Sequence, residues 1–385
     1  KVEMKKSSLN KIAVFSPFLN PVGVKRATFG LSKKFSENGY EVDLLSIHKE
    51  WDDLDFNQNM NLIYLSKLFK NFPTKGYLIF RIVSILVSLR TVFALSKYLK
   101  NNNPDILFVS MMPFVAWLGL KLSGKPGIKF IISIQGYPRN NLFRRVAWKN
   151  VFKSADRVIA ESKSLQNLIF EMTNSYKNLS YIYNPHFEEQ DEFKIESKNM
   201  NEFGNYIIGV GRLTKQKNFS LLINAFSKIN FIKDTKLIIV GDGEERKYLN
   251  KLIQKLDKES RDKKLSSRII FTGEVQEPLG YIRNAKMIVI PSLWEGLPRV
   301  AIEAQALKTP IISSCNEGGL GEILLDGNAG ILTTPDDVDD LVNAITLYEN
   351  DESLASKNAQ EGFKNIDRFS LRSSSNKYLK IFSEL

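Results

Sequence analysis

The segment from Pro291 to Glu303 carries the densest set of chemically capable residues in this chain of 385 residues. An apolar strand end leads into a turn that contains Glu295, and Pro298 marks the first turn of a helix. Inside one helix, eight positions would separate Glu295 from Glu303 by about 12 Å along the axis, so the two carboxylates cannot share a proton. We expect Glu295 in the loop to meet the reacting end of a ligand, and Glu303 in the helix to bind a vicinal diol such as ribose. Taken alone, each is more often a solvated surface glutamate.

The backbone between these two glutamates is suited to binding oxygen atoms. N–H groups at the start of a helix have no partner within the helix and carry the positive end of its dipole. They can therefore hold phosphate or hydroxyl oxygens. The residues that offer this backbone are Gly296, Leu297, Arg299 and Val300, and Pro298 sets the turn.

A second motif combines a glycine with two cations. An apolar strand runs into Gly211 and Arg212, and Lys217 follows five positions later. Arginine offers a planar fork and lysine a compact charge, which together suit a diphosphate, although basic residues of a solvated loop look the same. Thr214 stands where a dinucleotide fingerprint has its third glycine, which argues against a nicotinamide cofactor. A further glycine turn at Gly243 follows another strand and would admit a ligand close to the backbone.

Apolar strands that alternate with helical segments must position these residues. In the first half we expect strands at 11–15, 42–47, 106–110, 130–134, 157–160 and 181–183, and helices at 25–38 and 78–99. In the second half we expect strands at 206–211, 237–241, 269–272, 287–291, 310–313 and 330–333. Such alternation indicates parallel sheets with helices on both faces.

The alternation of predicted strands and helices is interrupted once, which predicts two domains. A polar stretch at 191–204 has no apolar periodicity and is interpreted as a linker between domains at 1–190 and 205–367. A single core seldom grows past about 250 to 300 residues, so the length agrees with two cores. We therefore expect an α/β fold of two Rossmann-like domains that face each other across a cleft, with the carboxyl ends of the strands along it.

Taken in order, the motifs of the second half resemble the retaining glycosyltransferases of family 4, which have the GT-B fold. The match consists of Gly211-Arg212 with Lys217-Asn218, Gly241-Asp242-Gly243, Glu295-Gly-Leu-Pro through Glu303-Ala, Pro310-Ile-Ile-Ser-Ser, Glu322-Ile-Leu and Arg368-Phe-Ser. The resemblance covers about 205–380 closely. In the first domain it is limited to Gly23-Val-Lys-Arg and the strand order.

The resemblance implies a role for each matching residue. Arg212 and Lys217 would bind the donor diphosphate and stabilise it as it leaves, Glu303 would bind the ribose, and Glu295 would lie by the donor sugar. The leaving phosphate would deprotonate the acceptor on the same face, so that no base, cofactor or metal is required. The last helix, from about 368 to 385, would cross back onto the first domain.

Two departures from the family pattern concern the first domain. Gln135 stands after the strand at 130–134 where many members have a histidine; glutamine can bind a sugar hydroxyl but carries no charge. The first loop has no glycine pair, so phosphate approach there depends on Gly23.

The charge of the chain is concentrated in its first half. Residues 1–190 have 27 Lys and Arg against 14 Asp and Glu, a net +13, whereas residues 191–385 have 27 against 28. The excess predicts a polyanionic partner, unless it is only a lysine bias of solvated helix faces. In the segment 78–99 we assign a core stripe to Leu78, Ile82, Ile85, Leu89 and Val92, and a mixed apolar and basic face to Ile79, Leu86, Arg90, Phe93 and Lys97. That face suits an anionic membrane or, equally, a buried helix with snorkelling cations.

The amino-acid composition limits the class of protein and the kinds of site that it can contain. With 43% hydrophobic and 25% charged residues the chain is an ordinary globular protein. Its two histidines argue against a multi-histidine metal site or a serine–histidine triad, and its single cysteine, with no signal peptide in view, favours the cytoplasm. Asp53 with Asp55 and Asp337 with Asp339 do not make a persuasive divalent-metal site.

The function predicted is hexosyl or N-acetylhexosaminyl transfer from a nucleotide diphosphate sugar, a UDP-sugar by preference. We expect a lipid-linked glycan acceptor at the inner face of the cell membrane, in polysaccharide assembly, and no nucleic-acid partner. Two alternatives remain: a nucleotide-sugar epimerase of the same fold, and a non-catalytic nucleotide-sugar-binding subunit.

Overall fold

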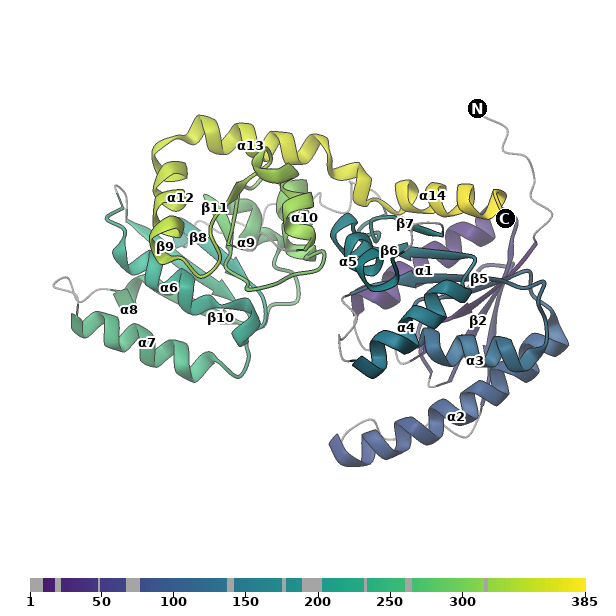
Figure 1. Cartoon of the computed structure of the whole chain (residues 1–385). Helices are drawn as coiled ribbons and strands as arrows, with labels where there is room; N and C mark the ends of the chain where they lie inside the picture. Colours follow the sequence, from purple (N-terminus) through teal and green to yellow (C-terminus); the bar gives the residue numbers. More distant parts are fainter. Residues whose placement is uncertain are drawn as a thin grey trace. The chain divides into compact units, whose positions relative to one another are not determined.

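The computed structural model of the chain describes residues 10–17, 22–47, 49–66, 77–136, 142–174, 178–188, 203–231, 234–259, 265–314 and 318–385. It forms two compact units: the first unit is Lys1–Glu188 with Leu371–Leu385, and the second unit is Glu189–Ser370. Each contains one parallel β-sheet with helices packed on it (Figure 1). This is the α/β architecture predicted from the sequence. Most of the predicted linker at 191–204 lies outside the described residues.

The first sheet has the strand order β3-β2-β1-β4-β5-β6-β7 among the residues described. Its strands are β1 (Lys11–Phe15), β2 (Glu41–Ser46), β3 (Met60–Tyr64), β4 (Ile106–Val109), β5 (Lys129–Ile134), β6 (Arg157–Ala160) and β7 (Leu179–Tyr181). The direction of chain progress reverses between β1 and β4, which makes the carboxyl ends of these strands the switch point where α/β sheets bind ligands. β3, a short strand at the sheet edge, was not predicted from the sequence.

The second sheet has the order β10-β9-β8-β11-β12-β13 in the described part of the chain. Its strands are β8 (Asn205–Val210), β9 (Thr235–Val240), β10 (Ile269–Gly273), β11 (Met287–Ile290), β12 (Ile311–Ser313) and β13 (Ile331–Leu332). Here the switch point lies between β8 and β11. Every strand predicted for either half is present, with its ends shifted by no more than about two residues.

Helices pack on both faces of the first sheet. One face is covered by α2 (Tyr77–Asn102), α3 (Pro113–Ser123), α4 (Leu142–Ser154) and α5 (Lys163–Thr173), and the other by α1 (Val22–Glu37) and α14 (Leu371–Ser383). The predicted return of the last helix to the first domain is confirmed, since Phe382 of α14 packs on Phe35 of α1 with ring centroids 4.9 Å apart. The link into α14 runs through the 3-10 turn η6 (Ile366–Phe369).

The helices of the second unit follow its strands. They are α6 (Phe219–Lys228), α7 (Arg246–Glu259), α8 (Leu265–Arg268), α9 (Leu279–Asn284), α10 (Arg299–Ala306), α11 (Gly319–Ile323), α12 (Val338–Asn350) and α13 (Glu352–Lys364), with 3-10 turns η4 (Lys215–Lys217) and η5 (Leu325–Gly327). α6 and α12 pack together on one face around the buried side chains of Phe226 and Ile345.

Helix α2 exposes a hydrophobic face, and this corrects one prediction. Leu89, assigned to the core stripe, is 55% exposed, and it joins Leu86 and Phe93, at 60% and 67%, on one side of the helix. The buried side is formed by Val87, Leu95 and other residues about 100° to 240° around the helix from Leu86. Val92 is buried as predicted, and the side chains of Leu78, Ile79, Ile82 and Ile85 lie outside the described residues.

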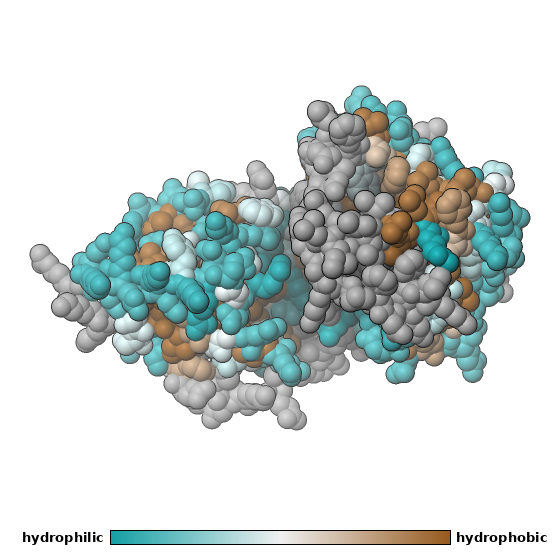
Figure 2. Space-filling view, turned by 90° about the horizontal axis from the view of Figure 1, so that it is seen from below, coloured by the Kyte–Doolittle hydropathy of each residue, from teal (hydrophilic) through white to brown (hydrophobic). Residues whose placement is uncertain are grey.

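The reason for this orientation is the close packing of α2 on α3. A Cβ at Gly119 of α3 would lie only 3.0 Å from the Leu95 side chain, so the glycine lets the two helices approach along the Leu95 side. Hydrophobic side chains consequently gather on the surface that carries α2 and α3 (Figure 2). Within the described residues, α2 and every other helix fall short of the length and hydrophobicity that crossing a bilayer requires.

Candidate active site

The loop after β8 is packed directly on the loop after β9. The Leu213 N–H donates to the Asp242 carbonyl over 2.9 Å. A Cβ at Gly243 would lie 2.4 Å from the Leu213 carbonyl oxygen, and a Cβ at Gly241 would lie 2.0 Å from that of Gly211. Both glycines are therefore needed for the two backbones to meet. That a ligand also contacts Gly243 stays a prediction.

The loop after β8 carries the two predicted cations. Arg212 is exposed, and no ion pair joins it to another described residue. Lys217, at the end of η4, makes a short ion pair with Oε1 of Glu295 in the loop after β11. Ser292 donates its hydroxyl to the same oxygen over 2.6 Å. The structure thus brings Lys217 and Glu295 together beside the switch point of the second sheet.

Gln216 hydrogen-bonds these two loops to each other and was not predicted from the sequence. Its carbonyl accepts the Leu293 N–H over 2.8 Å, and its side-chain amide donates to the Trp294 carbonyl over 2.9 Å. A glutamine between two lysines gives no local sign of this role, because its partners lie 77 and 78 positions away. Ser292 was also missed, although its partner Glu295 lies only three positions further along the chain.

The two glutamates occupy different elements, as expected. Glu295 lies in the loop, only 7% exposed, and Glu303 lies within α10, 8% exposed. Arg299, in the first turn of α10, donates from Nε to Oε1 of Glu303 over 2.7 Å. Because Pro298 stands at the N-terminal boundary of this helix, the N–H groups of Arg299 and Val300 fall in a first turn that lacks intrahelical partners.

The remaining part of this loop is held by the start of α11. The Gly319 N–H donates to the Gly296 carbonyl over 2.8 Å. A Cβ at Gly319 would lie 2.3 Å from that carbonyl oxygen and 2.7 Å from the Leu297 side chain. Gly296 and Leu297 are therefore fixed by packing on a neighbouring glycine, so their backbone has one orientation toward the site.

The predicted residues of the first unit lie apart from this cluster in the chain. Gln135 directly follows β5 and is partly buried. Gly23 is the second residue of α1, so the helix begins earlier than the 25–38 predicted. Neither placement tests whether these residues bind a ligand, and both assignments stay predictions.

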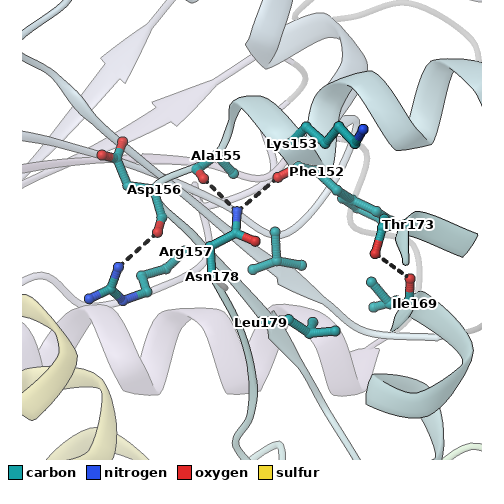
Figure 3. A pocket seen from close by; sticks show the side chains of 10 residues that line it. Phe152, Lys153, Ala155, Asp156, Arg157, Ile169, Thr173, Asn178 and Leu179 are labelled. Atoms are coloured by element: carbon teal, nitrogen blue, oxygen red, sulfur yellow. Dashed lines mark hydrogen bonds between the residues drawn. The ribbon is translucent and has the colours of Figure 1, made fainter. Parts of the chain in front are cut away.

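Two pockets have linings that contain none of the predicted site residues. One, of about 300 Å³, opens in the first unit at the amino end of β6, where Asn178 donates to the Phe152 and Ala155 carbonyls and Arg157 to the Asp156 carbonyl (Figure 3). The Asn178 amide and the Arg157 guanidinium are thus engaged by backbone carbonyls, and the pocket lies at the sheet edge opposite to Gln135. The other, of about 570 Å³, lies beside the second-unit site and is lined by Thr214, Lys215, Asn218, Phe219, Ser220, Glu245, Tyr248, Leu249, Leu293 and Asp336.

The aspartate pairs considered for metal binding have other partners. Asp53 accepts an ion pair from Lys25, which lowers the pKa of its carboxyl. Asp337 caps α12 by accepting the N–H groups of Asp339 and Asp340. Within the described ranges, no three His, Cys, Asp or Glu side chains form a group that could hold a metal ion.

Comparison with known families covers both units. The model described as "Glycosyl transferases group 1" matches residues 190–365, and the one described as "Glycosyltransferase Family 4" matches residues 21–186. The first match contains the whole second-unit site. The second match covers the strands β2 to β7 and the helices between them.

Individual relatives agree with these matches. An uncharacterised glycosyltransferase of Methanocaldococcus jannaschii is 29% identical over 284 residues, 64% of this chain and 68% of its own. An α-1,4-N-acetyl-D-galactosaminyltransferase of Campylobacter jejuni, which acts on an undecaprenol-diphosphate-linked glycan, is 25% identical over 97% of this chain and 99% of its own. The crystal structure of Anabaena Alr3699/HepE in complex with UDP has a TM-score of 0.75 at 18% identity, over 98% of this chain and 100% of its own. This last likeness concerns the fold.

Proposed function

The chain belongs to the GT-B glycosyltransferases of family 4, and on that premise we propose that it transfers a hexose or N-acetylhexosamine from a UDP-sugar to a lipid-linked glycan with retention of anomeric configuration. The observation that carries this proposal is the cluster at the second switch point. Lys217 contacts the nearly buried Glu295 there, and Gln216 hydrogen-bonds the loop of Lys217 to the loop of Glu295. Arg212 lies on the same loop as Lys217, and the nearly buried Glu303 lies in the helix that follows the loop of Glu295.

The cations are suited to a leaving diphosphate. The Lys217 ammonium has three N–H donors, of which the ion pair with Glu295 uses one, so two remain for phosphate oxygens. Arg212, exposed one residue beyond Gly211, adds a fork for two further oxygens. Charge develops on the diphosphate as the C1–O bond breaks, and fixed cations are most effective at that moment.

The same loops would bind the rest of the donor. Glu303 would accept hydrogen bonds from the ribose diol, and the first-turn N–H groups of Arg299 and Val300 would hold sugar or phosphate oxygens. In the retaining reaction the acceptor oxygen bonds to C1 on the face that the diphosphate leaves, and its proton passes to a departing phosphate oxygen. This route needs neither a protein base nor a metal ion.

The relatives support the choice of substrates. The Campylobacter enzyme transfers N-acetylgalactosamine to a polyprenyl-diphosphate glycan, and the Anabaena structure contains UDP. With a lipid-linked acceptor, we propose that the enzyme acts at the cytoplasmic face of a membrane. We propose that the exposed face of α2 makes the membrane contact, because Leu86, Leu89 and Phe93 lie there among Arg90 and Lys97.

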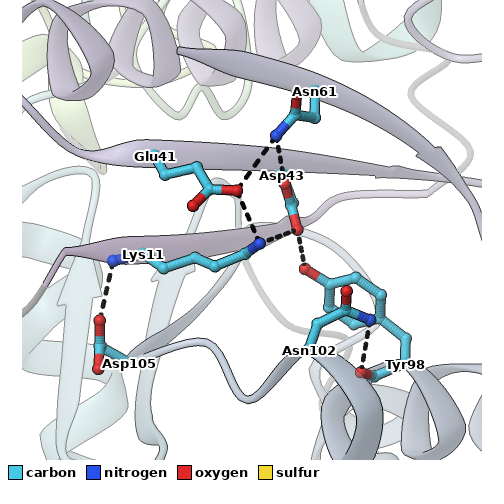
Figure 4. Close-up of polar contacts among 7 residues, drawn as sticks. All are labelled: Lys11, Glu41, Asp43, Asn61, Tyr98, Asn102 and Asp105. Carbon is cyan, nitrogen blue, oxygen red and sulfur yellow. Dashed lines mark hydrogen bonds and ion pairs between the residues drawn. The ribbon is translucent and has the colours of Figure 1, made fainter.

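A buried polar network keeps this face turned outward. Asp43 of β2, 1% exposed, accepts the Tyr98 hydroxyl of α2, the Asn61 amide at 3.0 Å and the Lys11 ammonium at 3.1 Å (Figure 4). Burial and the Asp43 hydrogen bond raise the pKa of the Tyr98 hydroxyl. The buried side of α2 is thereby fixed to the sheet, and the opposite side is left for a partner.

A donor screen tests the proposal. Thermal shift and release of UDP or GDP are measured across a panel of nucleotide sugars, with and without a polyprenyl-diphosphate-linked glycan. We expect UDP release that depends on the acceptor and yields a glycosylated lipid of retained configuration. Conversion of the donor to its epimer without an acceptor would favour the epimerase alternative, and binding without turnover would favour the binding subunit.

A further inference from the structure

The carboxyl edge of the first sheet has polar residues that play no part in the site of the second unit. Gln135 is the first residue after β5 and Glu161 the first after β6. The strands pair in parallel with Ile134 opposite Ala160, and the Glu161 N–H donates to the Ile134 carbonyl over 3.1 Å. Gln135 and Glu161 are therefore neighbours at the carboxyl edge of the first sheet.

Strand alternation places both side chains on the α14 face of the sheet. Ser133, two residues before Gln135, shares a 2.9 Å hydrogen bond with the Tyr378 hydroxyl of α14. The carboxylate of Glu161 acts on the same tyrosine, since its charge contributes to the raised pKa of Tyr378, after burial. The Gln135 amide and the Glu161 carboxyl thus lie on the same face of the sheet, at its carboxyl edge.

This edge contains polar atoms that the protein itself does not satisfy. Both Oε1 and Nε2 of Gln135 are buried and make no hydrogen bond within the part of the chain that the structure describes. The same holds for the hydroxyl of Ser16, 0% exposed, at the end of β1 on the same edge. Buried polar groups in native proteins are nearly always hydrogen-bonded, so unsatisfied ones mark a place where a ligand supplies the partner.

The charge at this edge indicates what kind of ligand fits. Burial alone raises the pKa of Glu161 to about 7, and no described cation compensates it. At neutral pH the group is therefore about half ionised: the carboxylate form repels a phosphate and accepts hydrogen bonds from hydroxyl groups, and the protonated form can also donate one. Beside a glutamine amide, which both donates and accepts, it forms a site for a neutral polyol.

We propose that Glu161 and Gln135 bind hydroxyl groups of the acceptor sugar and select that sugar. The proposal rests on the glycosyl transfer proposed above and adds a subsite to it. Glu161 accepts a hydrogen bond from one hydroxyl, and Gln135 donates to or accepts from its neighbour. The diphosphate and nucleotide of the donor remain with the cations of the second unit.

The test is a kinetic comparison of Glu161→Gln and Gln135→Leu with wild type, with a UDP-N-acetylhexosamine donor and a polyprenyl-diphosphate-linked glycan. Glu171→Gln, an exposed site on α5, is the matched control. We expect the acceptor KM to rise about 10-fold or more in both variants while the donor KM changes by less than about twofold, since sites that hydrogen-bond a hydroxyl lose discrimination when a partner is removed. Unchanged acceptor KM, or an equal rise for the donor, overturns the subsite.

A binding measurement separates this proposal from the proposed function. Saturation-transfer NMR with the free acceptor glycan and UDP reads binding without turnover. If wild type transfers no sugar to any acceptor, the proposed function fails, but loss of glycan contact in Glu161→Gln with UDP contact retained still supports the subsite. If wild type transfers sugar and the variant keeps its full glycan contact, the subsite fails while the function stands. Glutamine matches glutamate in shape and removes a buried charge, so the variant should fold.

Discussion

Replacing Glu161 by glutamine should stabilise the first unit in alkaline solution far more than in acid. Burial raises the pKa of Glu161 from its ordinary 4.5 to about 7. Between these pH values the native chain still holds a proton that the unfolded chain has released, so wild type loses stability as the pH rises through this window. Glutamine does not ionise and escapes the loss.

The magnitude follows from the size of the pKa rise. At about 1.36 kcal/mol for each pKa unit, the rise corresponds to about 3 kcal/mol once the carboxyl is fully ionised. Because the residue is partly exposed and about pH 5 lies inside the window, we expect the advantage of Glu161→Gln over wild type to grow by about 1 to 2.5 kcal/mol between about pH 5 and about pH 8.

Urea unfolding of the full chain, followed by tryptophan fluorescence, measures this advantage. Three of the four tryptophans, Trp51, Trp117 and Trp148, belong to the first unit, so the signal reports mainly on it. Glu171→Gln should follow wild type at both pH values. If the difference between Glu161→Gln and wild type is the same at both, the carboxylate is solvated, and the burial argument for the sheet edge is refuted.

Three further outcomes are expected. Arg212→Ala and Lys217→Ala should each lower kcat by about 100-fold or more in folded protein, because leaving-group charge develops in the transition state; near-normal steady-state rates would remove both from the site. Glu303→Gln should weaken UDP binding, measured by calorimetry, by about 1.5 to 3 kcal/mol. Unchanged affinity would mean that Glu303 does not bind the nucleotide and serves as the ion-pair partner of an arginine in α10. Wild type should float with anionic vesicles at low salt and less at 1 M, where the Debye length is about 3 Å. Arg90→Glu combined with Lys97→Glu should abolish flotation, and a double variant that floats like wild type would contradict the α2 membrane face.

The strand pattern of this fold could be predicted because most strands are buried on both faces. Ile12 to Phe15 and Leu237 to Val240 are continuous apolar runs with at most 3% exposure, which is typical of central strands in parallel sheets. β3 could not be predicted in this way. It lies at the sheet edge, where only Met60 is buried, and its neighbours Asn59 and Asn61 interrupt the apolar pattern.

Helix faces were less predictable than strands. The apolar residues of α2 run almost all round the helix, so periodicity alone could not decide which side is buried. Contact with Gly119 of α3 and the bond from Tyr98 to Asp43 decide it, and these partners are distant in sequence. Leu89 was therefore assigned to the wrong side, whereas Leu86 and Phe93 were placed on the side that the structure leaves exposed.

Some residues of the candidate site could be predicted from short motifs in the sequence, and others could not. Arg212 and Lys217 belong to one short motif and Glu295 to another, 78 positions after Lys217, and the structure brings Lys217 and Glu295 into contact. Gln216 and Ser292 support that contact, but nothing in their local sequence marks them. The partners of Gln216 follow another strand, so its role becomes visible only when the pairing of the strands is known, whereas Ser292 bonds within its own loop.

Local charge, and not the net charge of each half, separates the proposed tasks of the two units. The half of the chain with net +13 has at its sheet edge an uncompensated carboxylate, Glu161, whereas the half with net −1 has Arg212 and Lys217 at its edge. We therefore propose that a diphosphate binds in the nearly neutral half. For the cationic excess of the first half we propose a role at the surface of α2, where exposed Arg90 and Lys97 lie next to exposed hydrophobic side chains. Charges that face solvent attract a surface over about a Debye length, while charges at a partly buried edge act on the atoms they touch.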